Sequence, residues 1–119
     1  MHGPGRLVYI ARMALSRIDA IRKILEKTPT DPFPRYGLAM ELKNQNLLDE
    51  AKAEFDELER RFPDYVPQYL MHFNLLVALK RKDDARALGE RGVAACSRKG
   101  DTHALGELQG AIDSLDSGD

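Results

Sequence analysis

The segment LKNQNLLDEA, residues 42–51, returns in outline further along the chain, at an offset of about 34 residues that falls within the range of known repeat lengths. The matched landmarks are Leu42 and Leu76, Asp49-Glu50-Ala51 and Asp83-Asp84-Ala85, Pro29 and Pro63, and the polar turns Lys43-Asn44-Gln45-Asn46 and Lys80-Arg81-Lys82. A fixed period of this size is typical of stacked helix pairs, because a single pair cannot bury its apolar face alone. The repeat therefore predicts an array of helical hairpins whose general function is to bind a partner.

Length and composition favour one helical domain. The chain has 119 residues and no tryptophan, and Leu, Ala, Glu, Lys and Arg dominate it, which suits helices. Its formal net charge of -1 gives no global field that would attract nucleic acid or an anionic membrane. We therefore expect no nucleic-acid partner and no membrane attachment.

Cysteine content and apolar runs bear on the compartment. Cys96 is the only cysteine, so an intrachain disulfide is impossible and a reducing compartment is expected. Its thiol is expected to be a small buried group. The longest apolar run near the start, residues 7–10, is too short for a signal-peptide core or a membrane span. These features predict a cytoplasmic protein.

The spacing of apolar residues predicts six helices. The apolar stripe of the first, over about residues 6–27, consists of Leu7, Ala11, Ala14, Ile18, Ile21 and Leu25. These residues alternate at steps of four and three, as one face of a helix does. The prolines of residues 28–34 end this helix, and further helices are expected over about residues 34–43, 48–61, 67–79, 83–98 and 102–115. Gly100 is expected to stop the fifth, and Asp101 or Thr102 to cap the sixth.

The first twelve residues form a separate segment. Residues 1–5 include two glycines and a proline and are expected to be irregular. Met13-Ala14-Leu15-Ser16 reads as a native start, so residues 1–12 are either a genuine extension, an upstream start-site choice or added sequence. We therefore divide the chain into an N-terminal extension, residues 1–12, partly irregular and able to start the first helix, and a helical domain, residues 13–119.

Residues 32–65 and 66–99 resemble two units of the tetratricopeptide repeat family, as found in small bacterial proteins of that family. The first unit carries the family pattern in Leu38-Ala39, Ala51, Phe55 and Pro63, and the second carries Tyr69 and Ala85. The resemblance implies an all-α fold of antiparallel helical hairpins stacked as a short right-handed solenoid. About two repeats would be flanked by an N-terminal half-repeat helix and a C-terminal capping helix.

Small residues in the expected fifth helix point to close packing. Gly89 and Gly92 share a face with Leu88, Val93 and Cys96, and a glycine costs about 1 kcal/mol relative to alanine inside a helix. Two glycines on one packing face therefore predict a very close contact with the capping helix.

Residues that could carry chemistry are sparse. His2, His72 and His103 are the only histidines, and none has a second histidine or a cysteine at helical spacing, so we expect no metal site. His72 is expected to be a partly buried packing residue. The sequence holds no recognisable nucleophile motif and no phosphate-binding glycine loop. We therefore predict no catalytic residues, no cofactor and no enzymatic activity.

The family resemblance implies that the first helix of each unit lines a concave groove. The candidate partner-binding residues on these helices are Phe33, Tyr36, Met40, Lys43, Asn44, Leu70, Asn74 and Val77. Such an apolar and aromatic surface with polar handles accepts an amphipathic helix or an extended peptide. The alternative is that Tyr36, Met40 and Leu70 simply pack against the N-terminal helix.

These features predict a non-enzymatic adaptor or scaffold that binds a helix or peptide segment of another protein in the groove. The alternative is a structural subunit of a homo-oligomer or larger assembly, with the N-terminal helix or the groove permanently buried. A helical-repeat nucleic-acid binder is disfavoured, because Lys80-Arg81-Lys82 reads as a solvated turn and not as a broad basic face.

Overall fold

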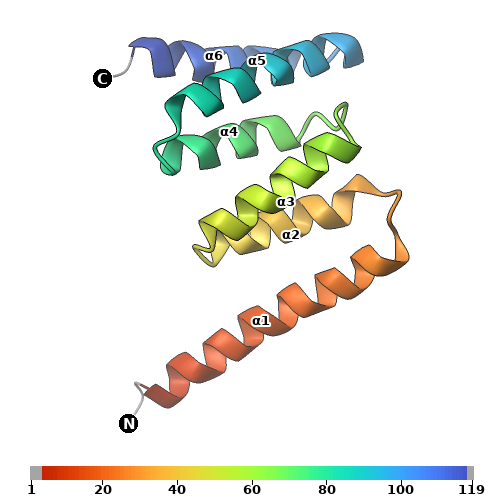
Figure 1. The fold of residues 1–119 in the computed structure, drawn as a ribbon, viewed down its shortest axis with the longest axis vertical. Coiled ribbons are helices and arrows are strands. Elements are labelled where there is room, and N and C mark those ends of the chain that lie inside the picture. Colours follow the sequence, from red (N-terminus) through yellow and green to blue (C-terminus); the bar gives the residue numbers. More distant parts are fainter. Residues whose placement is uncertain (1–3, 118–119) are drawn as a thin grey trace.

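The computed structural model describes residues 4–117, which form an elongated stack of helices with extents of 50 × 39 × 21 Å (Figure 1). Its helices are α1 (Pro4–Lys27), α2 (Pro32–Asn44), α3 (Leu48–Arg61), α4 (Gln68–Ala78), α5 (Lys82–Lys99) and α6 (Thr102–Ser117). Among the described residues there is no strand, and no helix combines the length and apolarity needed to cross a membrane. The fold is all-α, as the sequence predicts.

Two helices begin earlier than expected, and both begin at a proline. α1 starts at Pro4, so Pro4 and Gly5 are helical and not irregular, while residues 1–3 of that expectation lie outside the described part of the chain. α2 starts at Pro32, where the Asp31 carboxylate accepts a hydrogen bond from the Phe33 amide at 3.0 Å. Proline is compatible with a first helical turn, because the amide hydrogens there have no partner within the helix.

The turns after α2 and α4 repeat the same geometry. Asn46 and Lys80, which are one repeat period apart, both have a φ of 62°. The next amide donates to the carbonyl five residues back in each case, from Leu47 to Leu42 and from Arg81 to Leu76, both at 2.9 Å. This left-handed C-terminal cap satisfies the last carbonyls of each helix. The sequence period is therefore also a structural period.

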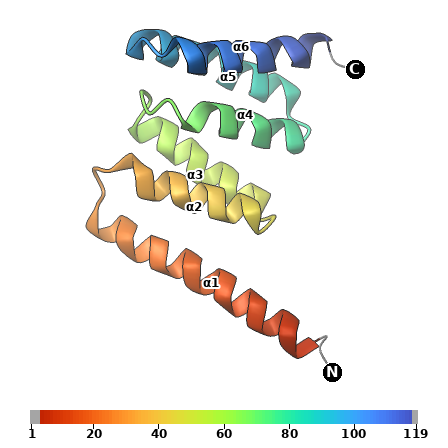
Figure 2. The ribbon, with the colours of Figure 1, turned by 180° about the vertical axis from the view of Figure 1, so that it is seen from behind.

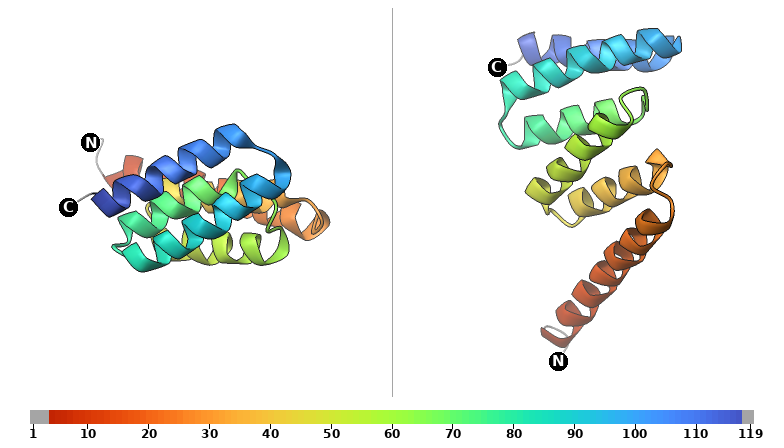
Figure 3. Two further views of the ribbon diagram at one scale, coloured as in Figure 1. Left: turned by 90° about the horizontal axis from the view of Figure 1, so that it is seen from above. Right: turned by 45° about the vertical axis from the view of Figure 1, so that its right-hand side comes forward.

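The hairpins stack in two layers. α2, α4 and α6 lie on one side and form the layer that we call the first-helix layer, while α3 and α5 lie on the other (Figures 2 and 3). α2 packs on α3, α4 on α5, and α6 on α5 and α4. α1 packs on α2 and diverges from the stack toward its N-terminus (Figure 1). The arrangement is the expected solenoid of two hairpins between a half-repeat helix and a capping helix.

The core is divided into two clusters. The first joins α1, α2 and α3 with Leu75 of α4, and its fully buried members include Leu38, Ala51 and Phe55. The second joins α4, α5 and α6. Since the first cluster includes α1 and the second includes α6, the half-repeat helix and the capping helix are each part of a core.

The expected close approach of α5 and α6 is confirmed. A Cβ added at Gly89 would lie 2.8 Å from the Ile112 side chain of α6, and one added at Gly92 would lie 2.8 Å from the Tyr69 side chain and would also clash with Leu108. Cys96 is buried nearby, as predicted. The two glycines therefore bring α5 close to both of its neighbours.

Candidate functional site

The first part of the candidate site lies on α2. Phe33 is 65% exposed, whereas Tyr36 and Met40 are half-buried against the first core cluster. The Tyr36 ring packs edge-on against Phe55 at 6.4 Å and Tyr65 at 5.6 Å between ring centroids. Burial raises the pKa of the Tyr36 hydroxyl. Phe33 is therefore available to a partner, while Tyr36 and Met40 also stabilise the fold.

The two polar candidates of α2 end that helix. Lys43 is half-buried and Asn44 is exposed, and the left-handed residue Asn46 follows closely. A flexible ammonium group and an amide at the end of a helix can donate hydrogen bonds to a bound segment. They lie at the opposite end of α2 from Phe33, roughly 15 Å along the helix axis.

α4 contributes the remaining candidates, which fall into two places. Leu70 packs against the second core cluster and lines a cavity of about 190 Å³ between α4, α5 and α6. Asn74 is exposed and Val77 is 39% exposed, and both line a second cavity. Asn74 and Val77 thus line one cavity, while Leu70, one turn before Asn74 on α4, lines another.

The cavity that contains Asn74 and Val77 has a volume of about 540 Å³, and we call it the α4–α6 cavity. It is lined by Phe73, Asn74, Val77, Lys80, Lys82, Ala111, Ser114 and Leu115. Its apolar residues come from α4 and α6, and its lysines from the turn before α5 and the start of α5. This combination can hold an apolar side chain with a hydrogen-bonding or anionic group beside it.

Sequence reasoning identifies only part of this cavity. Ala111 and Leu115 are recognisable as part of the apolar face of the last helix, and Lys80 and Lys82 as a polar turn. Nothing in a single sequence shows that α6 lies beside α4 closely enough to complete a cavity with that turn. Tertiary packing brings these residues together.

The packing alternative accounts for some of the candidates. Tyr36 and Met40 belong to the cluster that also contains Ile18, Ile21 and Leu25 of α1. Leu70 instead belongs to the cluster of α4, α5 and α6, so its burial does not come from α1.

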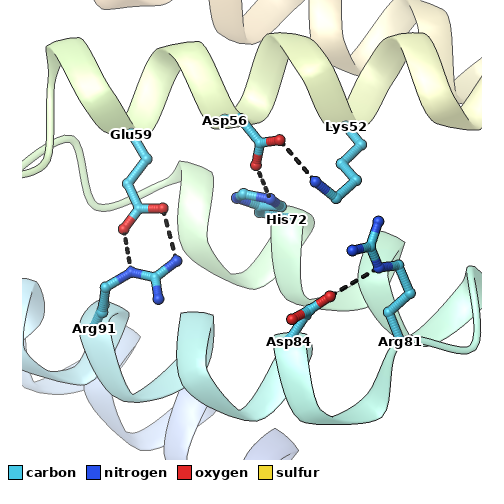
Figure 4. A network of polar contacts seen from close by, with 7 residues as sticks. All are labelled: Lys52, Asp56, Glu59, His72, Arg81, Asp84 and Arg91. Atoms are coloured by element: carbon cyan, nitrogen blue, oxygen red, sulfur yellow. Dashed lines mark hydrogen bonds and ion pairs between the residues drawn. The ribbon is translucent and has the colours of Figure 1, made fainter.

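The two hairpins also meet through a set of polar contacts (Figure 4). Arg91 of α5 binds Glu59 of α3 with hydrogen bonds of 2.6 and 3.0 Å. His72 is 1% exposed, stacks on Phe55 at 5.2 Å and has its Nε2 atom 3.3 Å from Asp56 Oδ1. Burial lowers the pKa of the His72 imidazole, although Asp56 opposes this shift. His72 is a packing residue, as predicted, and it is buried more deeply than expected.

Nothing in these contacts forms a metal centre. Across residues 4–117, no group of three or more His, Cys, Asp or Glu side chains is arranged to hold a metal ion. The polar contacts therefore hold the hairpins together rather than forming a ligand shell.

No protein-family model matches the chain and no curated protein sequence matches it. Among solved structures, the chain is similar to a tetratricopeptide repeat domain protein from Salinibacter ruber in its solution structure, with 35% identity, a TM-score of 0.73, and coverage of 76% of this chain and 92% of that one. The crystal structure under the same description gives 36% identity, a TM-score of 0.69, and coverage of 72% and 97%.

A more distant structure shows the fold alone. The TPR2B domain of yeast Sti1, solved as a complex with pHsp70, has a TM-score of 0.78 at 14% identity and covers 95% of this chain and 90% of that one. The similarity extends over nearly the whole chain, including most of the flanking helices.

Proposed function

The chain belongs to the tetratricopeptide repeat family, and from this membership we propose that it is a non-enzymatic adaptor. In this proposal the first-helix layer of α2, α4 and α6 holds a helix or extended segment of another protein. The proposed contact residues are Phe33, Lys43, Asn44, Asn74 and Val77. The half-buried candidates Tyr36, Met40 and Leu70 pack beneath this surface.

The α4–α6 cavity is the observation that carries this proposal. It opens on the first-helix layer and its volume of about 540 Å³ is within the range of sites that hold peptide side chains and small ligands. Val77 is apolar and 39% exposed at its edge, and Asn74 is exposed beside it. Exposed apolar anchors beside hydrogen-bonding groups are typical of peptide-binding surfaces.

A pair of variants tests the proposal. Asn74→Ala with Val77→Asp changes two exposed positions of the cavity, so we expect the fold to persist and partner capture to weaken by at least about 2 kcal/mol, the usual scale of a binding hot spot. Glu90→Ala is the control, because Glu90 is exposed on the face of α5 that points away from the core. Equal capture by the cavity variant, with loss of capture by the control, would place the working surface on α3 and α5.

A structural subunit is the second candidate function, and α1 favours it. The exposed large apolar residues of α1 are Leu7, Val8, Tyr9, Ile10, Met13, Leu15 and Ile24. A surface of this kind marks an interaction site when its residues lie side by side. A solution mass of at least twice 13.4 kDa that does not fall on dilution would favour the structural-subunit function. A monomeric mass would favour the adaptor function.

A further inference from the structure

The repeat period shows which face of α1 lacks a neighbour. One period apart, Arg17, Ile21 and Ile24 of α1 are equivalent to Ala51, Phe55 and Leu58 of α3. In α3 all three equivalent residues are buried in the first core cluster, which α3 shares with the first helix of its own hairpin. α1 has no such first helix before it among the described residues, since the stack begins with α1.

Two of these three positions are correspondingly open in α1, while Ile21 is half-buried against the first core cluster. Ile24 is 50% exposed where Leu58 is fully buried, and the Arg17 side chain is 57% exposed where Ala51 is fully buried. Along the helix, this face continues at steps of three and four as Ile10, Met13, Arg17, Ala20 and Ile24, which we call the open stripe of α1. It adjoins the stripe of Ala14, Ile18, Ile21 and Leu25 that packs on α2.

The charged residues that α1 itself places on or beside the open stripe are cationic, and the Glu41 carboxylate of α2 lies next to one of them. Arg17 lies on it, and Lys27 flanks it one turn beyond Ile24. The two acidic residues of α1, Asp19 and Glu26, fall roughly 140–160° away around the helix at 100° per residue. Arg17 donates from Nε to Glu41 at 2.6 Å, which leaves the other guanidinium N–H groups able to bind a second carboxylate.

We propose that the open stripe of α1 binds an acidic amphipathic helix of a partner protein, which lies against α1 as α2 lies against α3. Its apolar face would cover Ile10, Met13 and Ile24, and its carboxylates would face Arg17 and Lys27. This surface is separate from the α4–α6 cavity, and the proposal does not rest on the function of that cavity.

A second copy of the chain fits this surface poorly. Pairing the open stripe with the open stripe of another copy would bring the cations Arg17 and Lys27 of both copies onto one interface. α6 of another copy has a polar outer face. His103, Gly106, Glu107 and Gly110 are exposed there, at the positions equivalent to Tyr69, His72, Phe73 and Leu76 of α4.

Two synthetic peptides, each long enough to form about four helical turns, test the proposal. Both carry leucine and alanine at the spacing of one helix face, and their remaining positions are glutamate in one peptide and lysine in the other. We expect the full chain to bind the glutamate peptide at least about tenfold more tightly than the lysine peptide, measured by fluorescence anisotropy, with the preference falling as salt is added.

Variants of α1 locate the binding. The double variant Met13→Gln with Ile24→Gln, which we call the stripe variant, should weaken binding of the glutamate peptide by about tenfold or more. Lys27→Glu, which removes no apolar group, should also weaken it. Leu15→Gln is the matched control, because Leu15 is 56% exposed on the other side of α1, roughly 200° from Met13. Asn74→Ala with Val77→Asp should leave this binding unchanged, so the test is independent of the cavity.

Several outcomes would overturn the proposal. Equal binding of the two peptides would show that the charges of the stripe do not select an acidic partner. Binding of the glutamate peptide that is unchanged in both the stripe variant and Lys27→Glu would show that the open stripe is not the binding surface. A dimer whose mass halves in the stripe variant would assign the stripe to a second copy. Binding to phosphatidylglycerol vesicles, lost in the stripe variant while the glutamate peptide fails to bind, would assign it to a membrane surface.

Discussion

At the scale of single residues, the glycines of α5 set the distance between helices. A Cβ at Gly92 would lie 2.8 Å from the Tyr69 side chain and would clash with Leu108. We expect Gly92→Ala to destabilise the protein by about 1–3 kcal/mol, because overpacking outweighs the gain of up to about 1 kcal/mol in helix propensity. Urea denaturation followed by circular dichroism measures the difference.

A second glycine provides the matched control for that substitution. Gly110 lies in α6 with nothing within 4 Å of an added Cβ, so Gly110→Ala should raise the free energy of unfolding by up to about 1 kcal/mol. If both substitutions stabilise the protein to the same extent, α5 and α6 are not as close as described.

His72 predicts a specific dependence on pH. Burial lowers the pKa of the folded imidazole below its ordinary value of 6.5, so the unfolded chain takes up a proton first as the pH falls. The contribution of His72 is therefore present above about pH 6.5 and is lost as the pH falls below it. Its neighbours Asp56, Glu59, Lys52 and Arg91 face it from α3 and α5.

The measurement compares wild type with His72→Phe between about pH 7.5 and about pH 5.5. We expect the free energy of unfolding of wild type to fall over this range and that of His72→Phe to fall less, since phenylalanine keeps the stack on Phe55 without titrating. Identical pH profiles would show that His72 does not carry the effect.

At the scale of helices, the repeat pattern is the reliable guide. The recurrence of the turn, with Ala51 and Ala85 at one position, predicts the hairpins, and Gly100 ends α5 with a φ of 68° as expected. The sequence pattern does not predict the start of α1 at Pro4, because a proline that breaks a helix interior is tolerated in the first turn. Capping by Asp31 similarly moves the start of α2 to Pro32.

The sequence predicts the type of candidate site, a surface of apolar and polar residues on the first helices, but only some of the residues that line it. Spacing along one helix groups Asn74 with Val77, and both residues line the α4–α6 cavity. Spacing does not show how deeply a side chain is buried between helices. Tyr36 is expected to be exposed to a partner, but it lies half-buried against Phe55 and Tyr65. The contribution of α6 to the cavity depends on tertiary packing.

α6 also supports a prediction about whole elements. Leu108 and Ile112 are buried in the second core cluster, and removal of α6 would expose the face of α5 around Gly89 and Gly92, which these two side chains contact. We expect a chain truncated after Gly100 to melt at a lower temperature and to aggregate. A truncated monomer with an unchanged melting temperature would show that α6 is dispensable.

At the scale of the whole molecule, the two core clusters meet at α4, which contributes Leu75 to the first and Phe73 to the second, and ion pairs flank this junction. Glu59–Arg91 and Asp64–Arg98 link α3 and the following loop to α5, and such exposed ion pairs contribute only about 0–1 kcal/mol each. A partner laid along α2, α4 and α6 would contact helices of both clusters at once. Binding in the proposed position would therefore also fix the two hairpins relative to each other.

The most direct test of the adaptor proposal is site-specific photo-crosslinking in cell extract. A benzophenone side chain is placed either at Val77, at the edge of the α4–α6 cavity, or at the exposed Glu90 on α5. We predict a discrete crosslinked species from the Val77 protein that is absent from the Glu90 protein and reduced by Asn74→Ala. A discrete species from Glu90 alone would contradict the assignment of the first-helix layer as the binding surface.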